Sequence, residues 1–365
     1  MTVMTVMMTA GTLGLVEASP VAAANHHTVV NCNHNPNALT SALISPQPGE
    51  TLVIKGVCFG NFVINTNLTL IGLKDAVLDG HDTGTTVTIN GAFRVELKNL
   101  TITHGSSSSN GGGILNNGGT VTLSGSTVRN NAVTGSSNGG GGIENNHGTL
   151  KLNQSTVRNN MATGTFGFGG GIDDNHGTTT LNHSTVSNNT ATFVAGGIET
   201  NQTKLTLDQS TVSNNSAAFI GGMDLSGVTS TLTMSDSTVK HNSAAGNTFS
   251  DVGGIEIESG TTATLYRSRV LDNTAATDSG GIFNAGATTL NQSTVSGNIA
   301  GTVGGGIGNR GNLTLRHSEV ERNTAFSDGG GIFKFSGTVT LQDSKVRHNH
   351  PNNCAPPNSV PGCRG

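Results

Sequence analysis

One repeated motif constrains this chain more than any other feature: Gly-Gly-Ile, a polar turn, alternating apolar residues, then Ser-x-Val-x-x-Asn. The motif recurs every 25 to 32 residues, with its Ile column at Ile114, Ile143, Ile172, Ile198, Met223, Ile255, Ile282, Ile307 and Ile332. Columns of Leu, Ser, Val and Asn follow at matching positions in every copy. A repeat of this length is one supersecondary unit, which buries its apolar face by stacking on its neighbours. The motif therefore predicts a solenoid.

Within each copy, apolar and polar residues alternate with a period of two, as Leu150, Lys151 and Leu152 do. This alternation indicates short strands, and turns rich in Gly, Asn and Ser separate three such runs per copy. No helical periodicity occurs inside the repeats. We predict an all-β fold, a single-stranded right-handed parallel β-helix of about a dozen coils with three short strands per coil.

The invariant small and polar columns are interpreted as architecture. We expect the Gly before each Ile to take a positive φ on entering the first strand. We expect the Asn column, Asn131 onward, to leave the third strand in left-handed geometry and to pass amide hydrogen bonds between coils. The Ser column, Ser126 onward, needs partners from the backbone or from the neighbouring Ser.

The two ends differ from the repeats. Residues 1–24 end in Ala22-x-Ala24 and resemble a signal peptide, truncated because the first basic residue is Lys55; a disordered leader is the alternative. Residues 25–60 are predicted as an N-terminal cap, with one or two helical turns at Asn37–Ile44 whose Leu39, Leu43 and Ile44 cover the first coil. The β-helix is assigned to residues 61–349, and residues 350–365 form a tail rich in Pro and Cys.

The four cysteines lie outside the repeats, at Cys32, Cys58, Cys354 and Cys363. Local pairing, Cys32 with Cys58 and Cys354 with Cys363, would staple both ends where stacking partners run out. Three connectivities exist for four cysteines, and the sequence does not choose among them. Zinc is the weaker interpretation because no Cys-x-x-Cys spacing occurs. Together with the leader, the cysteines favour a secreted or cell-surface protein.

Three early segments carry a resemblance to a known class: Leu68-Thr69-Leu70-Ile71-Gly72, Leu78-Asp79-Gly80 and the run from Leu100 to Gly105. They resemble secreted bacterial right-handed β-helix repeat proteins with a pectate-lyase-like fold. The Gly-Gly-Ile and Val-x-x-Asn pair also resembles the Gly-Gly-Ala-Ile and Phe-x-x-Asn repeats of chlamydial polymorphic outer-membrane proteins. The resemblance spans residues 50 to 350 and implies the fold, but no particular activity.

The position after the Ile column should point away from the core, and in five consecutive copies it is acidic: Glu144, Asp173, Glu199, Asp224 and Glu256. Stacked at ~4.8 Å, neighbouring charges repel by ~1 kcal/mol in water and by ~3 kcal/mol at an effective dielectric of about 20. We therefore expect a compensating cation, a cationic ligand or raised pKa values at this acidic ladder. Aromatic residues precede four of the five positions, at Phe166, Phe168, Phe193, Phe219 and Phe249.

An exposed acidic ladder flanked by Phe would suit a saccharide groove; alternatively, the Phe side chains fill the loops and the carboxylates are simply solvated. We predict a secreted or surface-displayed β-helix, non-catalytic, acting in adhesion or glycan binding. The alternative is a polysaccharide lyase or glycoside hydrolase. A hydrolase needs two carboxylates roughly 5 to 9 Å apart, and a calcium-dependent lyase needs clustered acids with a basic residue, but no basic residue accompanies the ladder. A remote alternative is ice binding through outward Thr columns such as Thr120 and Thr122.

Other ligand classes receive little support. We predict no cofactor and no metal, with Ca²⁺ at the acidic ladder as the one alternative. His147 and His176 share a column but lack a third ligand. A net charge of −4 and scattered basic residues argue against nucleic acid. We expect a monomer with no integral membrane segment, whose partner is a polysaccharide or a cell-surface glycan.

Overall fold

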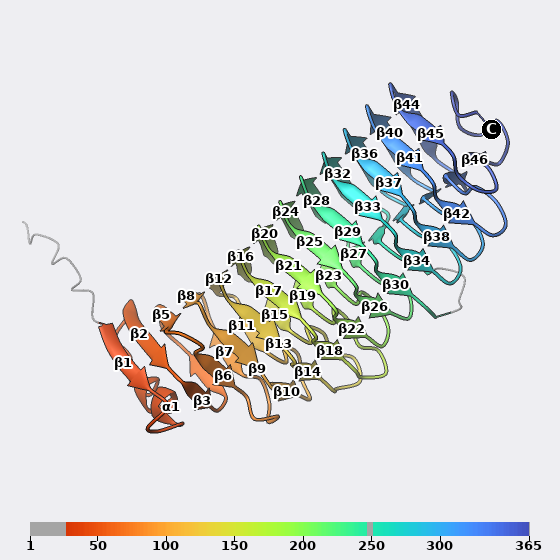
Figure 1. Ribbon diagram of the computed structural model, residues 1–365. Coiled ribbons are helices and arrows are strands. Elements are labelled where there is room, and N and C mark those ends of the chain that lie inside the picture. Colours follow the sequence, from red (N-terminus) through yellow and green to blue (C-terminus); the bar gives the residue numbers. More distant parts are fainter. Residues whose placement is uncertain (1–26, 247–250, 365) are drawn as a thin grey trace, which may run out of the picture.

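The computed structural model describes residues 27–246 and 251–364. It confirms the predicted fold class: a right-handed parallel β-helix of about twelve coils, rising from β1 to the C-terminal end (Figure 1). The described residues form four parallel sheets rather than three, because nine coils have a short fourth strand, which in eight of them directly follows the Asn column. No helix among these residues is long and apolar enough to cross a membrane.

The sheet that carries the Leu column, called here the Leu sheet, has 13 strands. Its strands are β1 (His27–Asn31), β2 (Glu50–Lys55), β5 (Leu68–Gly72), β8 (Arg94–Lys98), β12 (Thr120–Ser124), β16 (Thr149–Asn153), β20 (Thr178–Asn182), β24 (Lys204–Asp208), β28 (Thr231–Ser235), β32 (Thr262–Tyr266), β36 (Ala287–Asn291), β40 (Asn312–Arg316) and β44 (Thr338–Gln342).

The Val sheet, which carries the Val column, has 12 strands. They are β3 (Val57–Phe59), β6 (Val77–Asp79), β9 (Thr101–Thr103), β13 (Thr127–Arg129), β17 (Thr156–Arg158), β21 (Thr185–Ser187), β25 (Thr211–Ser213), β29 (Thr238–Lys240), β33 (Arg269–Leu271), β37 (Thr294–Ser296), β41 (Glu319–Glu321) and β45 (Lys345–Arg347).

The Ile sheet, which carries the Ile column and the acidic ladder, also has 12 strands. They are β4 (Phe62–Ile64), β7 (Val87–Asn90), β11 (Ile114–Asn117), β15 (Ile143–Asn146), β19 (Ile172–Asn175), β23 (Ile198–Asn201), β27 (Met223–Ser226), β31 (Ile255–Ile257), β35 (Ile282–Asn284), β39 (Ile307–Asn309), β43 (Ile332–Lys334) and β46 (Cys354–Ala355).

The fourth sheet, called the outer sheet, consists of two-residue strands that the sequence did not predict. They are β10 (Ser106–Ser107), β14 (Ala132–Val133), β18 (Met161–Ala162), β22 (Thr190–Ala191), β26 (Ser216–Ala217), β30 (Ser243–Ala244), β34 (Thr274–Ala275), β38 (Ile299–Ala300) and β42 (Thr324–Ala325). After each of these strands the chain turns back toward the Ile sheet, and this return path covers the candidate site described below.

The core is a single apolar interior built from the three predicted columns. Ile114 pairs in register with Ile143, Leu123 with Leu152, and Val128 with Val157. The side chains of these columns are buried from the first repeat to the ninth, with the last coil's Leu341 and Val346 half-buried. Stacking like residues in register lets each coil bury the apolar face of the one before it.

The Asn column forms the predicted amide ladder. The Nδ2 of Asn131 donates to Oδ1 of Asn160 at 3.0 Å, and Asn160 donates likewise to Asn189 at 3.0 Å. The prediction of left-handed geometry for these residues was wrong by one position: the positive φ belongs to the preceding residue, 54° at Asn130 and 55° at Asn159. That preceding residue makes the turn, so the column Asn can point inward and bond.

The Gly pair before each Ile has a different cause from the one predicted. The positive φ lies at the third residue before Ile, as at Gly111 and Gly140, and not at the two Gly next to Ile. Those two are excluded from bearing a side chain by close approach of the neighbouring coil: a Cβ on Gly113 would lie 2.7 Å from the carbonyl oxygen of Gly142. The Gly column therefore reflects coil-to-coil contact.

The buried Ser column finds both kinds of partner that were expected. The backbone N–H of Ser126 donates to Oγ of Ser155 at 3.2 Å, and that Oγ donates to the carbonyl of Asn153 at 2.9 Å. The same pair of bonds recurs in the following coils. The column thus links each coil to the next at the corner between the Leu and Val sheets.

At the N-terminal end, α1 (Ala38–Ala42) forms within the predicted helical turns. Leu39 is buried and Leu43 packs against the core, but Ile44 is 81% exposed, so its predicted place on the covering face is wrong. A boundary at residue 60 is not a structural one, because β2 and β3 already pair with β5 and β6 of the following coils. The predicted leader, residues 1–24, lies outside the described residues.

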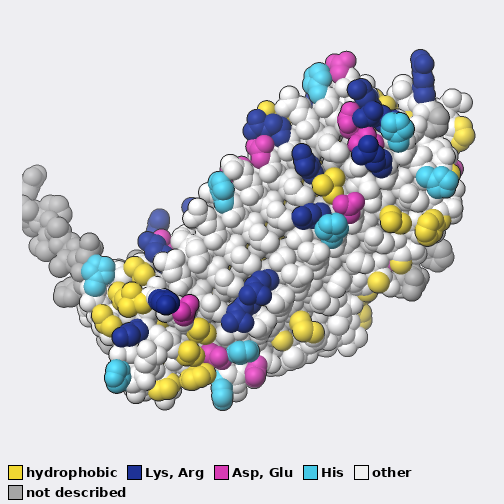
Figure 2. Space-filling view, in the orientation of Figure 1, with side chains coloured by type: hydrophobic (Ala, Val, Ile, Leu, Met, Phe, Trp, Pro, Cys, Tyr) yellow, Lys and Arg dark blue, Asp and Glu magenta, His cyan; other side chains and the backbone are white. Residues whose placement is uncertain are grey.

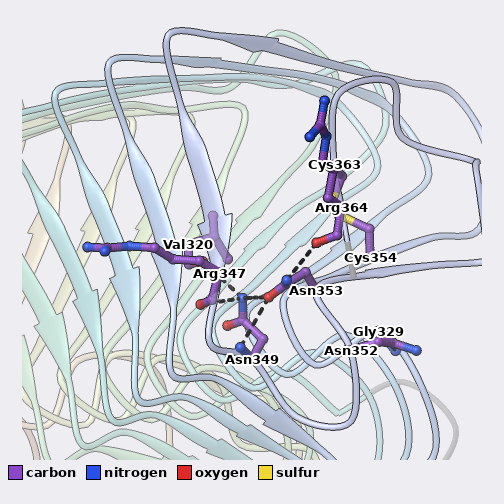
Figure 3. Close-up of a disulfide and its surroundings, with 9 residues drawn as sticks. All are labelled: Val320, Gly329, Arg347, Asn349, Asn352, Asn353, Cys354, Cys363 and Arg364. Carbon is purple, nitrogen blue, oxygen red and sulfur yellow. Dashed lines mark hydrogen bonds between the residues drawn. A yellow bond between two sulfur atoms is a disulfide. The ribbon is translucent and has the colours of Figure 1, made fainter.

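Both predicted disulfides are present, Cys32–Cys58 and Cys354–Cys363, and no described cysteine is free. The C-terminal tail acts as a cap on the Asn ladder (Figure 3). Asn349 donates to Oδ1 of Asn353 at 3.1 Å, and Asn353 in turn donates to the carbonyl of Arg364 at 2.7 Å. Asn353 therefore stands where the Asn of a further coil would be.

Candidate functional site

The five carboxylates of the acidic ladder lie in register on successive strands of the Ile sheet, as predicted. Glu144 pairs with Asp173, Asp173 with Glu199, Glu199 with Asp224, and Asp224 with Glu256. Leu115 precedes the ladder on β11, and Phe283 follows it on β35. The side chains alternate with the inward Ile column and so leave the core on its outer side.

The expectation that these carboxylates face solvent was wrong. Glu144 is 1% exposed, Asp173 6% and Asp224 4%, while Glu199 and Glu256 are half-buried and Oε2 of Glu199 is buried. The reason is the return path from the outer sheet, which runs back over the outer side of the Ile sheet. These return segments, residues 134–140, 163–169, 192–195 and 218–220, are called here the cover loops.

Backbone contacts show how closely the cover loops lie over the acids. A Cβ on Gly139 would overlap the carboxylate of Asp173, so the loop backbone is in contact with that side chain. Asn110 Nδ2 donates to Glu144 Oε1 at 3.4 Å, and Asn110 Oδ1 accepts from the N–H of Gly139 at 3.2 Å. The cover loops also pair with one another through parallel bridges, Gly139 with Phe168 and Phe168 with Val194.

Burial changes the acid–base chemistry of the ladder. Removal from water, with repulsion from Asp173 next, raises the pKa of Glu144 well above its usual value. Burial first, then neighbouring carboxylates, likewise raises the pKa values of Glu199 and Asp224. Burial raises the pKa of Asp173 to about 6, and burial with the charge of Glu258 raises the pKa of Glu256 to about 7.

Several ladder oxygens have no hydrogen-bond partner in the described structure: Glu144 Oε2, Glu199 Oε2 and Asp224 Oδ1. A buried carboxylate without donors is unfavourable, whereas a protonated carboxyl can donate to the next carboxylate. Because Glu144 adjoins Asp173 and Glu199 adjoins Asp224 in register, a protonated carboxyl in each pair could donate to its neighbour. We therefore infer that these carboxyl pairs share protons.

The predicted aromatic residues gather in the cover loops. Phe193 packs edge-on against Phe166, Phe168 and Phe219, with ring centroids 5.2, 5.9 and 4.7 Å away. Phe166 is 48% exposed and the other three are half-buried. Phe249 lies outside the described residues. These four rings thus form one cluster within the cover loops.

Sequence reasoning missed a second cluster, beyond the last acid of the ladder. The guanidinium of Arg310 lies over the rings of Phe283 and Phe335, at 5.3 and 5.0 Å from their centroids, and Phe333 packs against Phe335 at 4.6 Å. Arg310 is exposed and Phe335 is 36% exposed. We call these four residues the aromatic–arginine patch. Phe283 and Phe333 stand in the ladder column, and this position is the sequence signal that could have identified them.

The aromatic–arginine patch borders a groove of about 430 Å³ at the corner between the Ile and Leu sheets. Its lining combines Arg310 with small or short polar residues, many of which expose their backbone: Gly260, Thr261, Thr262, Ala285, Gly286, Ala287, Gly311, Asn312 and Gly337. The charge of Arg310 also lowers the pKa of Glu256, so this cation acts on the last acid of the ladder. The patch therefore joins a cation, aromatic faces and an acid beside a groove.

One further buried acid, Asp174, lies on the inner side of the Ile sheet. It continues an amide column in which Asn116 donates to Asn145 at 2.6 Å and Asn145 donates to Asp174 Oδ1 at 2.7 Å. Burial raises the pKa of Asp174 to about 7 against the lowering effect of its hydrogen bonds. Its position at the end of a donor column is structural.

The remaining sequence candidates do not form sites. His147 and His176 stack with centroids 4.9 Å apart, as their shared column predicts. Within residues 27–246 and 251–364, no three His, Cys, Asp or Glu side chains are grouped so that they could hold a metal ion. Calcium at the acidic ladder stays a prediction that this arrangement does not favour. Lys151 interrupts the outward Thr column between Thr122 and Thr180. On the face in Figure 2, Lys and Arg form no continuous stripe.

Comparison with known proteins gives likeness of architecture. No protein-family model matches the chain, and no curated protein matches it. The pectate lyase Pel9A is similar with 12% identity and a TM-score of 0.49, over 90% of this chain and 80% of that one. A mannuronic acid-specific family 6 lyase from human gut microbiota has 12% identity and a TM-score of 0.45, over 87% and 83%. A PL6-family polysaccharide lyase from Pseudopedobacter saltans has 14% identity and a TM-score of 0.39, over 94% and 96%.

Proposed function

We propose that this chain is a secreted or surface-displayed β-helix that binds a glycan without cleaving it, through the aromatic–arginine patch. The observation that carries the proposal is the exposed guanidinium of Arg310, held over Phe283 and Phe335 at the edge of a groove. A stacked guanidinium is fixed in orientation while its N–H groups point outward as donors. Sugars present both hydroxyl groups and apolar ring faces, and this patch offers a partner for each.

The groove suits an extended ligand because small side chains line it. The Gly, Ala and Thr residues of the groove leave backbone and hydroxyl groups within reach of a chain that lies along the coils. The exposed Glu258 next to Glu256 adds acceptors on the same side. These polar groups could orient a ligand that packs against the aromatic rings of the patch.

The alternative is a polysaccharide lyase or glycoside hydrolase that uses the acidic ladder. A hydrolase places two carboxylates on either side of the scissile bond. The ladder has carboxylates at the right order of spacing, but the cover loops lie between their oxygens and any polymer outside. We therefore rank binding without cleavage above catalysis.

Two observations support the location and partner. Two disulfides fit an oxidising compartment, since such bonds persist mainly outside the cytosol. The scattered basic residues seen in Figure 2 do not suit nucleic acid. We accordingly propose a monomer that meets a polysaccharide or a surface glycan outside the cell.

The test is a panel of plant, microbial and host glycans, assayed for binding by calorimetry and for cleavage by new reducing or unsaturated ends. Arg310→Ala and Phe335→Ala should each weaken binding about tenfold or more, as loss of a central contact does. Arg316→Ala, an exposed arginine at the end of β40, is the matched control and should leave affinity unchanged. Equal affinity in all four proteins would refute the site, and cleaved product would establish the enzymatic alternative.

A further inference from the structure

The five-carboxylate ladder and its cover loops form a unit that the glycan site does not explain. The carboxyl groups repeat at ~4.8 Å along the solenoid, and three of the five side chains are at most 6% exposed. Oxygens of Glu144, Glu199 and Asp224 are buried with no hydrogen-bond partner among the described residues. In a column that contains only acceptors, these oxygens can be satisfied from within only by protons that neighbours share.

The charged groups around the ladder would not neutralise it. On the strands themselves, Asp174 and Glu258 add further acids near Asp173 and Glu256. The segment before β31 contributes the buried Asp251, and the segment before β35 contributes Asp278, which accepts from Thr302 at 2.5 Å. Arg310 is the one cation, among the described residues, whose charge acts on a ladder pKa, that of Glu256. Beside Glu144 lies the uncharged Asn110, and beside Asp173 lies the backbone of Gly139 in a cover loop.

The cover loops are connected to one another along the solenoid. Three of the four turn into their strands at a residue with positive φ, 68° at Gly140, 49° at Gly169 and 52° at Ala195, and the fourth, residues 218–220, has none. Neighbouring cover loops pair through the bridges Gly139–Phe168 and Phe168–Val194 and the hydrogen bond from Phe219 N–H to the carbonyl of Phe193. The cover is thus a continuous strip that joins the Ile sheet at these turns.

We propose that the cover loops are a pH-dependent lid: they lie closed over the acidic ladder while its carboxyl groups share protons, and they loosen when those groups ionise. Ionised neighbours at this spacing repel and demand water. The core beneath needs no change, because the Ile column faces the other way. The opened form exposes a column of carboxylates flanked by the Phe cluster.

The direction of the effect follows from proton linkage. A carboxyl group whose pKa is raised in the closed form stabilises that form fully below its ordinary pKa, and this contribution is lost as pH rises through the raised value. Asp173, with a pKa of about 6, and Glu256, with a pKa of about 7, place the loosening between weakly acidic and neutral pH. The lid therefore closes in acid and opens toward alkaline pH.

The experiment is hydrogen exchange of the full chain at about pH 5 and about pH 8, corrected for intrinsic exchange rates. Peptides that span residues 134–142 and 163–171 should lose at least about tenfold protection at the higher pH, while peptides of the Val sheet keep theirs. In the double variant Asp173→Asn with Glu199→Gln, the loss should be much smaller. Asp82→Asn, an exposed acid in the left-handed region, is the control and should behave as the wild type.

Two outcomes would overturn the lid: wild-type cover peptides equally protected at both pH values, or the same loss of protection in the double variant as in the wild type. The wild-type comparison stands even if the variant does not fold. The glycan assay at Arg310 is independent of it, so failure of one proposal leaves the other measurable.

Discussion

Replacing Asp173 with Asn should stabilise the protein at neutral and alkaline pH and leave it nearly unchanged in acid. Asp173 is 6% exposed and lies between Glu144 and Glu199 in the ladder. Asn has almost the same shape, and its Oδ1 could accept a hydrogen bond from a protonated Glu144 beside it. The substitution therefore removes the capacity to ionise while it keeps the packing.

The magnitude follows from the raised pKa. Burial moves the pKa of Asp173 from 3.8 to about 6, and each pH unit of difference corresponds to 1.36 kcal/mol, so ionisation costs the folded state about 3 kcal/mol. In the wild type, this stability is fully present below about pH 4 and is lost as pH rises through about 6. The variant should therefore be equal to wild type near pH 4 and about 3 kcal/mol more stable near pH 8.

The assay is urea unfolding of both proteins across this pH range, followed by circular dichroism and analysed by linear extrapolation. Asp82→Asn serves again as the exposed control and should shift stability by less than about 0.5 kcal/mol at every pH. A variant that is less stable than wild type at pH 8 would show that the Asp173 carboxylate is a required hydrogen-bonding group. The proton-sharing description of the ladder would then be wrong.

Two further substitutions test the architecture. Asn215→Ala removes four side-chain hydrogen bonds of the amide ladder, to Asn189 (two), Val186 and Asn242, and should lower the free energy of unfolding by about 4 kcal/mol. The control is Asn153→Ala, whose side chain has no hydrogen bond in the described structure, and it should lower the free energy of unfolding by less than about 0.5 kcal/mol. Gly197→Ala would bring its Cβ to 2.5 Å from the carbonyl oxygen of Gly222 and should cost about 3 kcal/mol in urea unfolding, against about 1 kcal/mol for Gly118→Ala, which meets only its positive φ. If the two variants of either pair lost the same free energy of unfolding, the cause assigned to that pair, side-chain hydrogen bonds or close coil contact, would be refuted.

The sequence was sufficient to predict what stacking alone determines. The Ile, Leu, Val, Ser and Asn columns identify residues that meet their own kind in the next coil, so the core, the amide ladder and the register of Glu144 with Asp173 follow from alignment of the repeats. The outer sheet was missed because a two-residue strand such as Ala132–Val133 is too short to show alternation. The periodic part of the fold can thus be predicted from the sequence, whereas its shortest strands cannot.

The exposure of the ladder was predicted wrongly because it depends on the segments that do not repeat. The connections before Glu144 and Glu199 differ in length and sequence, and only their three-dimensional path places Gly139 against Asp173. The aromatic–arginine patch was missed for a related reason. Arg310, Phe283 and Phe335 belong to three different coils, so no residue spacing within one copy of the repeat predicts their contact.

The acidic ladder and the Asn ladder show the same stacking with different chemistry. A stacked amide both donates and accepts, so Asn160 accepts from Asn131 and donates to Asn189 without help from solvent. A stacked carboxylate only accepts, and it can imitate the amide only while it holds a proton. On the inner side of the same sheet, one acid, Asp174, is tolerated because Asn145 donates to it. On the outer side, five acids follow one another. Their oxygens can form hydrogen bonds along the column, as the amides do, only at a pH where some of the carboxyl groups remain protonated.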